Sequence, residues 1–282
     1  MSGTLGALCQ RRRADTSMAS TKSRNETTSS LLVNKTHLAH QLDMGLGGRL
    51  RIGLIELATD QTSEHEFRRL FALPGVDFYI SRIWNDATIT PETLSRMVKD
   101  IDGGMRVILP DLRIDVAGFT CTSGAMVIGE DEVFSLMRKS RPGIPCSSPI
   151  TGALAGMKAL GLKRIALLTP YVQAINDIMR SYIEDRGVSV PVMGSFNNAN
   201  DDEVARITLA STRAAVMDLA RSQHVDGIFV SCTSLRTIEI IAEVEDEIGK
   251  PMLASNPAQA WHLLRLGGVG DALPQWGQLF TV

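Results

Sequence analysis

The stretch "DGIFVSCTSL" (residues 226–235) has the same plan as "DVAGFTCTSG" (residues 115–124). In each, an Asp precedes a short apolar run, and a Cys-Thr-Ser follows with its cysteine six residues after the Asp. Unbroken apolar runs of this kind are typical of strands buried on both faces of a parallel sheet. The two stretches therefore predict two buried strands, each ending in a cysteine, Cys121 and Cys232.

The repetition extends beyond the cysteines. "RIGLIEL" (residues 51–57) and "RIALLT" (residues 164–169) are similar apolar runs that begin 70 and 68 residues before the respective cysteines. Apolar runs alternate with helical stretches throughout this region, which is typical of an α/β fold. We predict two similar α/β halves with parallel sheets, related by pseudo-twofold symmetry. Because ligands of open α/β sheets bind beyond the carboxyl ends of the strands, both cysteines are expected to face one cleft.

The sequence predicts four segments. Residues 1–48 form a tail predicted to be disordered, residues 49–158 the first α/β half, residues 159–250 the second, and residues 251–282 a C-terminal segment that returns to the first half. Strands are expected at residues 51–57, 76–83, 106–110, 115–121, 143–148, 163–169, 188–194, 226–232 and 250–256. Each Cys-Thr-Ser is expected to lead directly into a helix.

Composition excludes several classes of function. A net charge of −2 over 282 residues provides no field for collecting nucleic acid or anionic membrane. No apolar run approaches the roughly 18 residues that span a bilayer, and the N-terminal stretch lacks a secretory h-region, so a cytoplasmic protein is predicted. The four cysteines form no CxxC, and the five histidines do not cluster with them, so neither a disulfide scaffold nor a metal site is expected.

The Cys-Thr-Ser motif suggests chemistry at a strand-to-helix turn. Thr and Ser are good helix N-caps, and the free amides there favour an anion and lower a cysteine pKa toward neutrality. Two such cysteines on opposite faces of a bound carboxylate would either move a carbon-bound proton from one face to the other or add a thiolate to a carbon–carbon double bond. Candidate carboxylate donors are Thr122, Ser123, Thr233, Ser234 and the strand-end Tyr171.

The motifs "CTSG", "TPY", "VSCTSLRT" and "GKPMLASNPAQAWHLLRL" resemble the aspartate/glutamate racemase superfamily, and more closely its maleate isomerase and arylmalonate decarboxylase branch. "RIGLIELATDQTSEHEFRRL", "YISRI", "TPYV" and "DDEVARI" are most similar to the ectoine utilization proteins of that branch. The resemblance covers roughly residues 51–268. It implies two Rossmann-like halves, no cofactor, no metal, Cys121 and Cys232 as the catalytic pair, and Thr122, Ser123, Thr233 and Tyr171 as carboxylate donors.

The sequence departs from the family pattern after its first strand. Maleate isomerases of the branch carry an Asn there, whereas this chain has Thr59 and Asp60. A negatively charged Asp60 in the site would repel a dicarboxylate and welcome a substrate amine, so we place both residues among the substrate-binding candidates. Arylmalonate decarboxylases of the branch keep only the second cysteine, and the presence of Cys121 therefore disfavours decarboxylation.

The sequence predicts a cofactor-independent isomerase or racemase that acts on a small carboxylate, such as an ectoine-derived amino acid in ectoine catabolism. One alternative is a maleate cis–trans isomerase that works through a covalent cysteine adduct, and another is a lyase like arylmalonate decarboxylase. A ligand-binding or regulatory protein that kept the cleft is the alternative outside the enzymes. The oligomeric state stays open, with a homodimer as one alternative.

Overall fold

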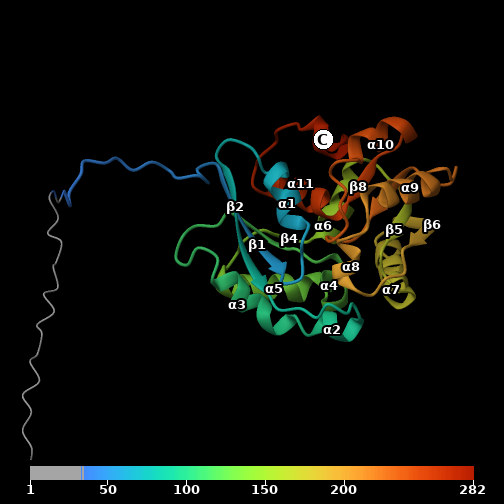
Figure 1. Ribbon diagram of the computed structural model, residues 1–282, viewed down its shortest axis with the longest axis horizontal. Coiled ribbons are helices and arrows are strands. Elements are labelled where there is room, and N and C mark those ends of the chain that lie inside the picture. Colours follow the sequence, from blue (N-terminus) through green and yellow to red (C-terminus); the bar gives the residue numbers. More distant parts are fainter. Residues whose placement is uncertain (1–32, 34) are drawn as a thin grey trace, which may run out of the picture. The chain divides into compact units, whose positions relative to one another are not determined.

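The computed structural model describes residues 33 and 35–282 (Figure 1). Val33 and residues 35–42 belong to a separate unit and carry neither helix nor strand, and Asp43–Val282 form the body. The predicted disordered tail, residues 1–48, lies largely outside the described residues. Within the described part of the chain, no helix is long and apolar enough to cross a bilayer.

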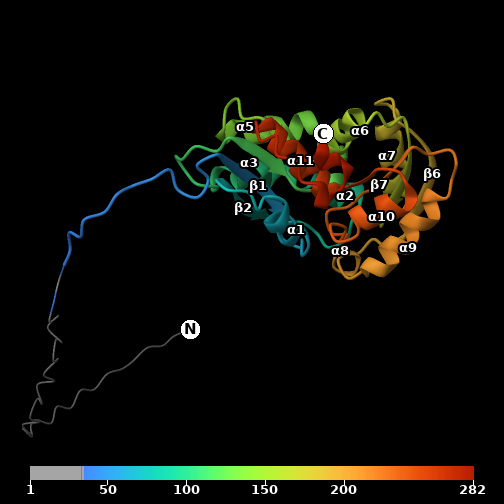
Figure 2. The same cartoon turned by 90° about the horizontal axis from the view of Figure 1, so that it is seen from above.

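The body contains two parallel four-stranded sheets with the same strand order, β2-β1-β3-β4 and β6-β5-β7-β8 (Figures 1 and 2). The predicted α/β architecture of two parallel-sheet halves is confirmed. The first sheet consists of β1 (Leu50–Leu57), β2 (Val76–Ile83), β3 (Val116–Phe119) and β4 (Cys146–Ser147). The second consists of β5 (Arg164–Thr169), β6 (Ser189–Ser195), β7 (Gly227–Val230) and β8 (Met252–Ala254).

Helices connect the strands of each sheet. In the first half they are α1 (Ser63–Leu70), α2 (Pro91–Ser95), α3 (Val98–Arg106), α4 (Thr122–Ile128), α5 (Glu130–Ser140) and α6 (Pro149–Ala159). In the second half they are α7 (Gln173–Glu184), α8 (Asp201–Val204), α9 (Leu209–Ala220), α10 (Ile241–Ile248) and α11 (Ser255–Leu266), followed by the 3-10 turns η1 (Pro274–Trp276) and η2 (Gln278–Thr281).

The central strands form because their side chains are apolar on both faces. Every residue of β3 and of β7 is buried, and so are five of the six residues of β5. Since parallel strands place their carboxyl ends at the same edge, β1 and β3 end side by side, as do β5 and β7. The loops that follow these strands are thereby brought to one region of each half.

Helices α6 and α11 are exchanged between the halves. Helix α6 follows the first sheet but contacts β8, whereas α11 follows the second sheet and contacts β3 and β4 in addition to β8. The two helices pack against each other in the middle of the body (Figures 1 and 2). At their crossing a Cβ added to Gly152 would lie 2.4 Å from the Ala258 carbonyl oxygen, so the close approach requires glycine.

Two predictions about secondary structure are wrong. Residues 106–110 form no strand, because Ile101, Met105 and Ile108 share one buried side of α3 and its C-terminal turn, while Val107 is 65% exposed. The second Cys-Thr-Ser does not lead directly into a helix either, since α10 begins only at Ile241.

The segment between Cys232 and α10 is held by a carboxylate of the first half instead. Glu66 Oε1, from α1, accepts the N–H groups of Thr237 at 2.7 Å and of Ile238 at 3.0 Å. These bonds take up backbone donors that a helix would otherwise use, so the segment continues as turns past the cysteine. Glu66 thereby fixes the path of the chain that follows the second motif.

Candidate active site

A cavity lined by residues of both halves contains the two motif cysteines. The space between atoms inside it is about 380 Å³, open solvent included. Its walls combine an apolar side from the first half with a polar side to which both halves contribute. The lining residues are Leu57, Asn85, Asp86, Ile89, Thr93, Leu94, Met97, Cys121, Thr122, Ser123, Tyr171, Asp201, Cys232 and Thr233.

Cys121 lies at the carboxyl end of β3 and caps α4. Its Sγ accepts the Gly124 N–H at 3.3 Å, and the side chain is 4% exposed. Burial raises the pKa of Cys121 to about 12, although the Gly124 N–H and the Ser123 hydroxyl act in the opposite direction. The prediction that this position lowers the cysteine pKa is therefore wrong: desolvation outweighs the local donors.

Cys232 occupies the corresponding place after β7. Its N–H donates to Ser255 Oγ at 3.0 Å, and its side chain is 5% exposed. Burial is again the largest influence and raises the pKa of Cys232 to about 12, and the negative charge of Asp201 is the next largest. Both cysteines accordingly rest as thiols.

Tyr171 follows β5 and is buried in the cavity wall, with 2% of its surface exposed. Its hydroxyl lies near the side chains of Cys232 and Ser123. Burial and the nearby cysteines raise the pKa of Tyr171 well above its ordinary value. The phenol therefore stays protonated and is available as a hydrogen-bond donor.

The structure brings some of the predicted substrate-binding residues together at the cavity and leaves others outside it. Thr122, Ser123, Tyr171 and Thr233 line the cavity beside the two cysteines. Thr59, Asp60 and Ser234 are not among the lining residues. Asp60 Oδ1 instead accepts the N–H groups of Thr62 and Ser63, at the start of α1. The roles of all these residues in binding or catalysis stay predictions.

The buried acid among the lining residues is Asp201, which the sequence did not single out. It is 6% exposed and lies in the connection after β6. Ser234 Oγ donates to Asp201 Oδ1 at 2.8 Å, and Thr59 Oγ1 donates to Asp201 Oδ2. Thr59 and Ser234 therefore border the site indirectly, by orienting this carboxylate.

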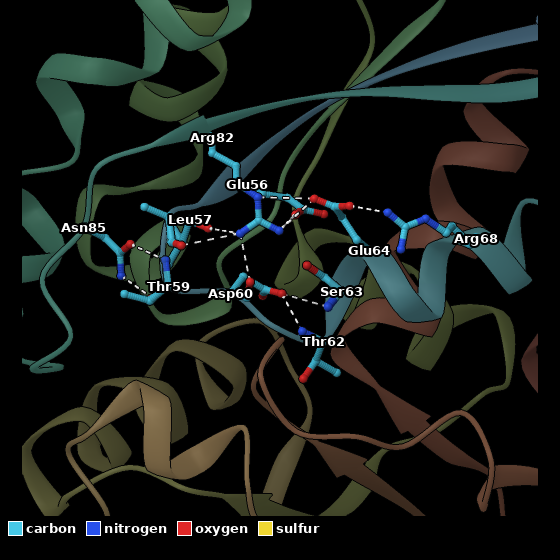
Figure 3. A network of polar contacts seen from close by, with 11 residues as sticks. Glu56, Leu57, Thr59, Asp60, Thr62, Ser63, Glu64, Arg68, Arg82 and Asn85 are labelled. Carbon is cyan, nitrogen blue, oxygen red and sulfur yellow. Dashed lines mark hydrogen bonds and ion pairs between the residues drawn. The ribbon is translucent and has the colours of Figure 1, made fainter.

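The loop after β1, which carries Thr59, is held by Arg82 of β2 (Figure 3). The guanidinium donates to the carbonyl oxygens of Leu57 at 3.0 Å and Asp60 at 2.8 Å, and to the Glu64 carboxylate at 2.7 Å. On the other side of the loop, Asn85 Oδ1 accepts the Thr59 N–H at 3.2 Å. A single arginine and asparagine thus set the position of the Thr59 hydroxyl.

Sequence reasoning missed Asp201, Asn85 and the apolar wall of Ile89, Leu94 and Met97. Asn85 lies two residues beyond the end of β2, and Asp201 six residues beyond the end of β6. A search for polar side chains shortly after every parallel strand, rather than after the cysteine strands alone, would have found both. Within residues 33 and 35–282, no three His, Cys, Asp or Glu side chains are grouped as a metal site.

Known proteins with similar sequences include decarboxylases and isomerases. Residues 128–280 match the family described as arylmalonate decarboxylase. The arylmalonate decarboxylase of Bordetella bronchiseptica is 33% identical over 140 residues, an alignment that covers 49% of this chain and 58% of that protein, less than two thirds of its length. The maleate isomerase of Geobacillus stearothermophilus is 25% identical over 244 residues, which cover 82% of this chain and 97% of that enzyme.

Solved structures show the same architecture. A variant of the Nocardia farcinica maleate cis–trans isomerase with a covalently bound succinylcysteine intermediate superposes with a TM-score of 0.73 at 25% identity, covering 82% of this chain and 98% of that one. A liganded variant of arylmalonate decarboxylase superposes with a TM-score of 0.72 at 26% identity and the same coverage.

Proposed function

Because the chain belongs to the arylmalonate decarboxylase family, whose matched relatives are decarboxylases and isomerases, we propose that it is a cofactor-independent isomerase or racemase of a small carboxylate, with Cys121 and Cys232 as the reacting pair. The observation that carries the proposal is the placement of these two cysteines, one from each half, on one buried cavity beside hydroxyl donors.

The proposed reaction moves one proton at the carbon next to the carboxylate. One cysteine first gives its thiol proton to solvent and then, as thiolate, removes the carbon-bound proton, while the other, as thiol, delivers a proton to the opposite face. The two sulfurs exchange protonation states, so the proton count of protein and substrate together does not change. Thr122, Ser123 and Thr233 hydroxyls and the Tyr171 phenol would hold the carboxylate and stabilise the charge that develops on its oxygens.

A second candidate is covalent cis–trans isomerisation. Its support is the match to maleate isomerases over 82% of the chain, together with the succinylcysteine in one of the similar structures. One thiolate would add to a carbon–carbon double bond while the other thiol protonates the neighbouring carbon. Rotation about the new single bond follows. Elimination, in which the second cysteine takes a proton back from carbon, would then restore one thiolate and one thiol.

The resemblance to ectoine utilization proteins suggests a specific substrate, an acylated diamino acid formed from ectoine, which would undergo the same proton transfer at its α-carbon. A homodimer is also proposed, and light scattering during size-exclusion chromatography tests it. Decarboxylation remains a less favoured outcome because Cys121 is present.

Proton NMR in D2O tests the proposal. The panel contains maleate, aspartate, glutamate, phenylmalonate and both enantiomers of an acetylated diaminobutyrate. Loss of an α-proton signal that requires both Cys121 and Cys232 would support proton transfer, whereas fumarate formed from maleate would support the covalent route. Substitution of each cysteine by Ala is compared with Cys146→Ala, a buried free cysteine whose thiol bonds to the Ile144 carbonyl and does not line the cavity.

If no substrate of the panel reacts although some of them bind, a ligand-binding protein becomes the better description. If activity survives in both the Cys121→Ala and the Cys232→Ala variant, the proposed chemistry is wrong. Intact-mass spectrometry during turnover separates the two enzymatic routes, because only the covalent route adds the mass of the substrate to the protein.

A further inference from the structure

The charges on the cavity walls are unbalanced. Two of the lining residues are acidic, Asp86 and Asp201, and none is Lys, Arg or His. Asp86 is exposed, whereas Asp201 is almost completely buried. Arg96 and Lys99 line a neighbouring hollow, which Asp86 also lines and Asp201 does not. The buried negative charge in the cavity is therefore Asp201.

Asp201 is held in place from both halves. Its N–H donates to the Ala87 carbonyl at 2.9 Å, and the residue before it, Asn200, forms an antiparallel bridge with Thr88. This places the start of α8, which belongs to the second half, against the segment after β2. Such backbone pairing fixes the main chain of Asp201 at the cavity wall.

The partners of the Asp201 carboxylate are neutral. Each oxygen accepts one hydroxyl, from Ser234 or Thr59. Among the described residues, no Lys, Arg or His nitrogen lies within 4.0 Å of an Asp201 oxygen. A carboxylate can accept about four hydrogen bonds, so Asp201 has room for further donors, and a buried charge is costly unless an opposite charge pairs with it.

We propose that Asp201 determines the specificity of this cavity by binding a substrate ammonium group. The substrate would be a small carboxylate that also carries a positively charged nitrogen, and not a dicarboxylate. The inference rests on the proposed function, since it takes the hydroxyl-lined side of the cavity as the place of the substrate carboxylate. In this arrangement the ammonium group, at the opposite end of the substrate from the carboxylate, binds to Asp201.

The same contact would couple binding to chemistry. The negative charge of Asp201 disfavours a thiolate at both Cys232 and Cys121. An ammonium group placed against Asp201 offsets this charge, so formation of the thiolate becomes easier when the correct substrate is bound. A dicarboxylate would have the opposite effect and add negative charge beside both sulfurs.

Probes that share one carbon skeleton test the inference. 2-Aminobutyrate, 2-hydroxybutyrate and ethylmalonate carry an ammonium, a hydroxyl or a second carboxylate on the carbon next to the carboxylate. 4-Aminobutyrate and glutarate place the ammonium or the second carboxylate at the far end. Affinities for the full-length chain are measured by calorimetry or ligand-observed NMR, and both readouts are independent of turnover.

Wild-type protein is expected to prefer the ammonium probe in at least one series. Asp201→Asn keeps the shape of the side chain, and it should weaken binding of that probe about 10- to 100-fold, the usual effect of losing a charged hydrogen-bond partner. It should also strengthen binding of the matching dicarboxylate. The control is Asp202→Asn, since the neighbouring Asp202 is exposed and does not line the cavity, and it should leave every affinity within about twofold.

Tighter binding of the dicarboxylate in both series by wild-type protein would overturn the inference without any variant being needed. So would failure of every ammonium probe to bind at millimolar concentration, or an unchanged preference in a folded Asp201→Asn variant. Deuterium exchange is followed in parallel. Binding of ammonium probes without deuterium exchange would contradict the proposed function but support the inference about Asp201. Cysteine-dependent turnover of dicarboxylates alone would support the proposed function and contradict the inference.

Discussion

The hydroxyls of Thr122 and Ser255 lie 2.9 Å apart, although 133 residues separate them in the chain. Ser255 Oγ also accepts the Cys232 N–H at 3.0 Å. One buried serine at the start of α11 therefore joins the two Cys-Thr-Ser motifs, which come from different sheets. The two cysteines owe part of their relative position to this side chain.

We expect Ser255→Ala to impair both stability and turnover. The substitution leaves the buried Cys232 N–H and the Thr122 hydroxyl without this partner, which should lower the free energy of unfolding by about 1–3 kcal/mol. Turnover of whichever substrate is identified should fall through kcat more than through KM, because the spacing of the reacting groups is disturbed. Urea denaturation and steady-state kinetics provide the measurements.

Ser189→Ala, at an exposed position of β6, is the matched control and should be close to neutral. If Ser255→Ala behaves like this control in both assays, the serine does not position the motifs.

Alkylation by iodoacetamide should report the charge next to the cysteines. With the pKa of Cys121 and Cys232 near 12, their reaction should be slow at pH 8 and should accelerate about tenfold per pH unit, because only the thiolate reacts. Asp201→Asn removes a negative charge that raises both pKa values, so both cysteines should react faster in the variant. Peptide mapping by mass spectrometry follows each cysteine separately.

Cys146 is the internal control for this experiment. Burial raises its pKa to about 11, and Asp201 is not among the causes, so its alkylation rate should be the same in both proteins. An equal acceleration of Cys146 would mean that the variant merely loosens the fold, and no acceleration at Cys232 would contradict the charge effect.

The stability of the protein should fall as the pH rises from about 5 to about 8. Glu56 on β1 is fully buried, and burial, followed by the charge of Asp60, raises its pKa from 4.5 to about 8 despite Arg82 Nη2 at 3.2 Å. Between these values the folded state holds a proton that the unfolded state releases. The contribution of Glu56 to the free energy of unfolding is fully present below about pH 4.5 and is lost as the pH rises through 8. This contribution is at most about 5 kcal/mol.

Glu56→Gln should flatten this part of the stability curve, measured by urea denaturation across the pH range. Glu66, whose pKa burial raises to about 6, acts in the same direction and is present in both proteins, so the difference between the curves isolates Glu56. Glu64→Gln removes the other carboxylate of Arg82, whose charge is one of the smaller causes that raise the Glu56 pKa, so it should reduce the slope only slightly. Identical slopes for wild type and Glu56→Gln would refute the prediction.

Gly152→Ala should destabilise the fold at the crossing of α6 and α11. The added methyl group would meet the Ala258 carbonyl oxygen at 2.4 Å, and overpacking of this kind costs about 1–3 kcal/mol. Gly103→Ala in α3 has nothing within 4 Å of the new Cβ, and as a helical glycine it should gain about 0.5–1 kcal/mol. The melting temperature should therefore fall in Gly152→Ala and rise in Gly103→Ala. A higher melting temperature in Gly152→Ala would show that the helices can move apart.

The two sheets were predictable because their central strands carry a pattern that little else produces. β3 and β7 are short apolar runs buried on both faces, and both end at a cysteine in the same sequence context. The failure at residues 106–110 has a related cause. A short apolar run is equally compatible with a strand and with one side of a helix. Here Met105 and Ile108 belong to a helical turn.

The polar part of the candidate site was less predictable because contacts between the halves decide it. Asp201 lies in a polar stretch that reads as a surface loop, and only its pairing with the segment after β2 buries it. Asp60 shows the opposite situation, since it does not line the cavity and its role in binding stays a prediction. Its position after β1 suggested the cavity, but its carboxylate turns back to the amides of Thr62 and Ser63.

The exchange of α6 and α11 makes the two sheets inseparable as building blocks. A fragment ending at Ala159 would contain the whole first sheet but lack the helix that covers β3 and β4, while its own α6 would have lost β8. We therefore expect neither half to fold as an autonomous module, and a split version to regain the fold only when both fragments are combined.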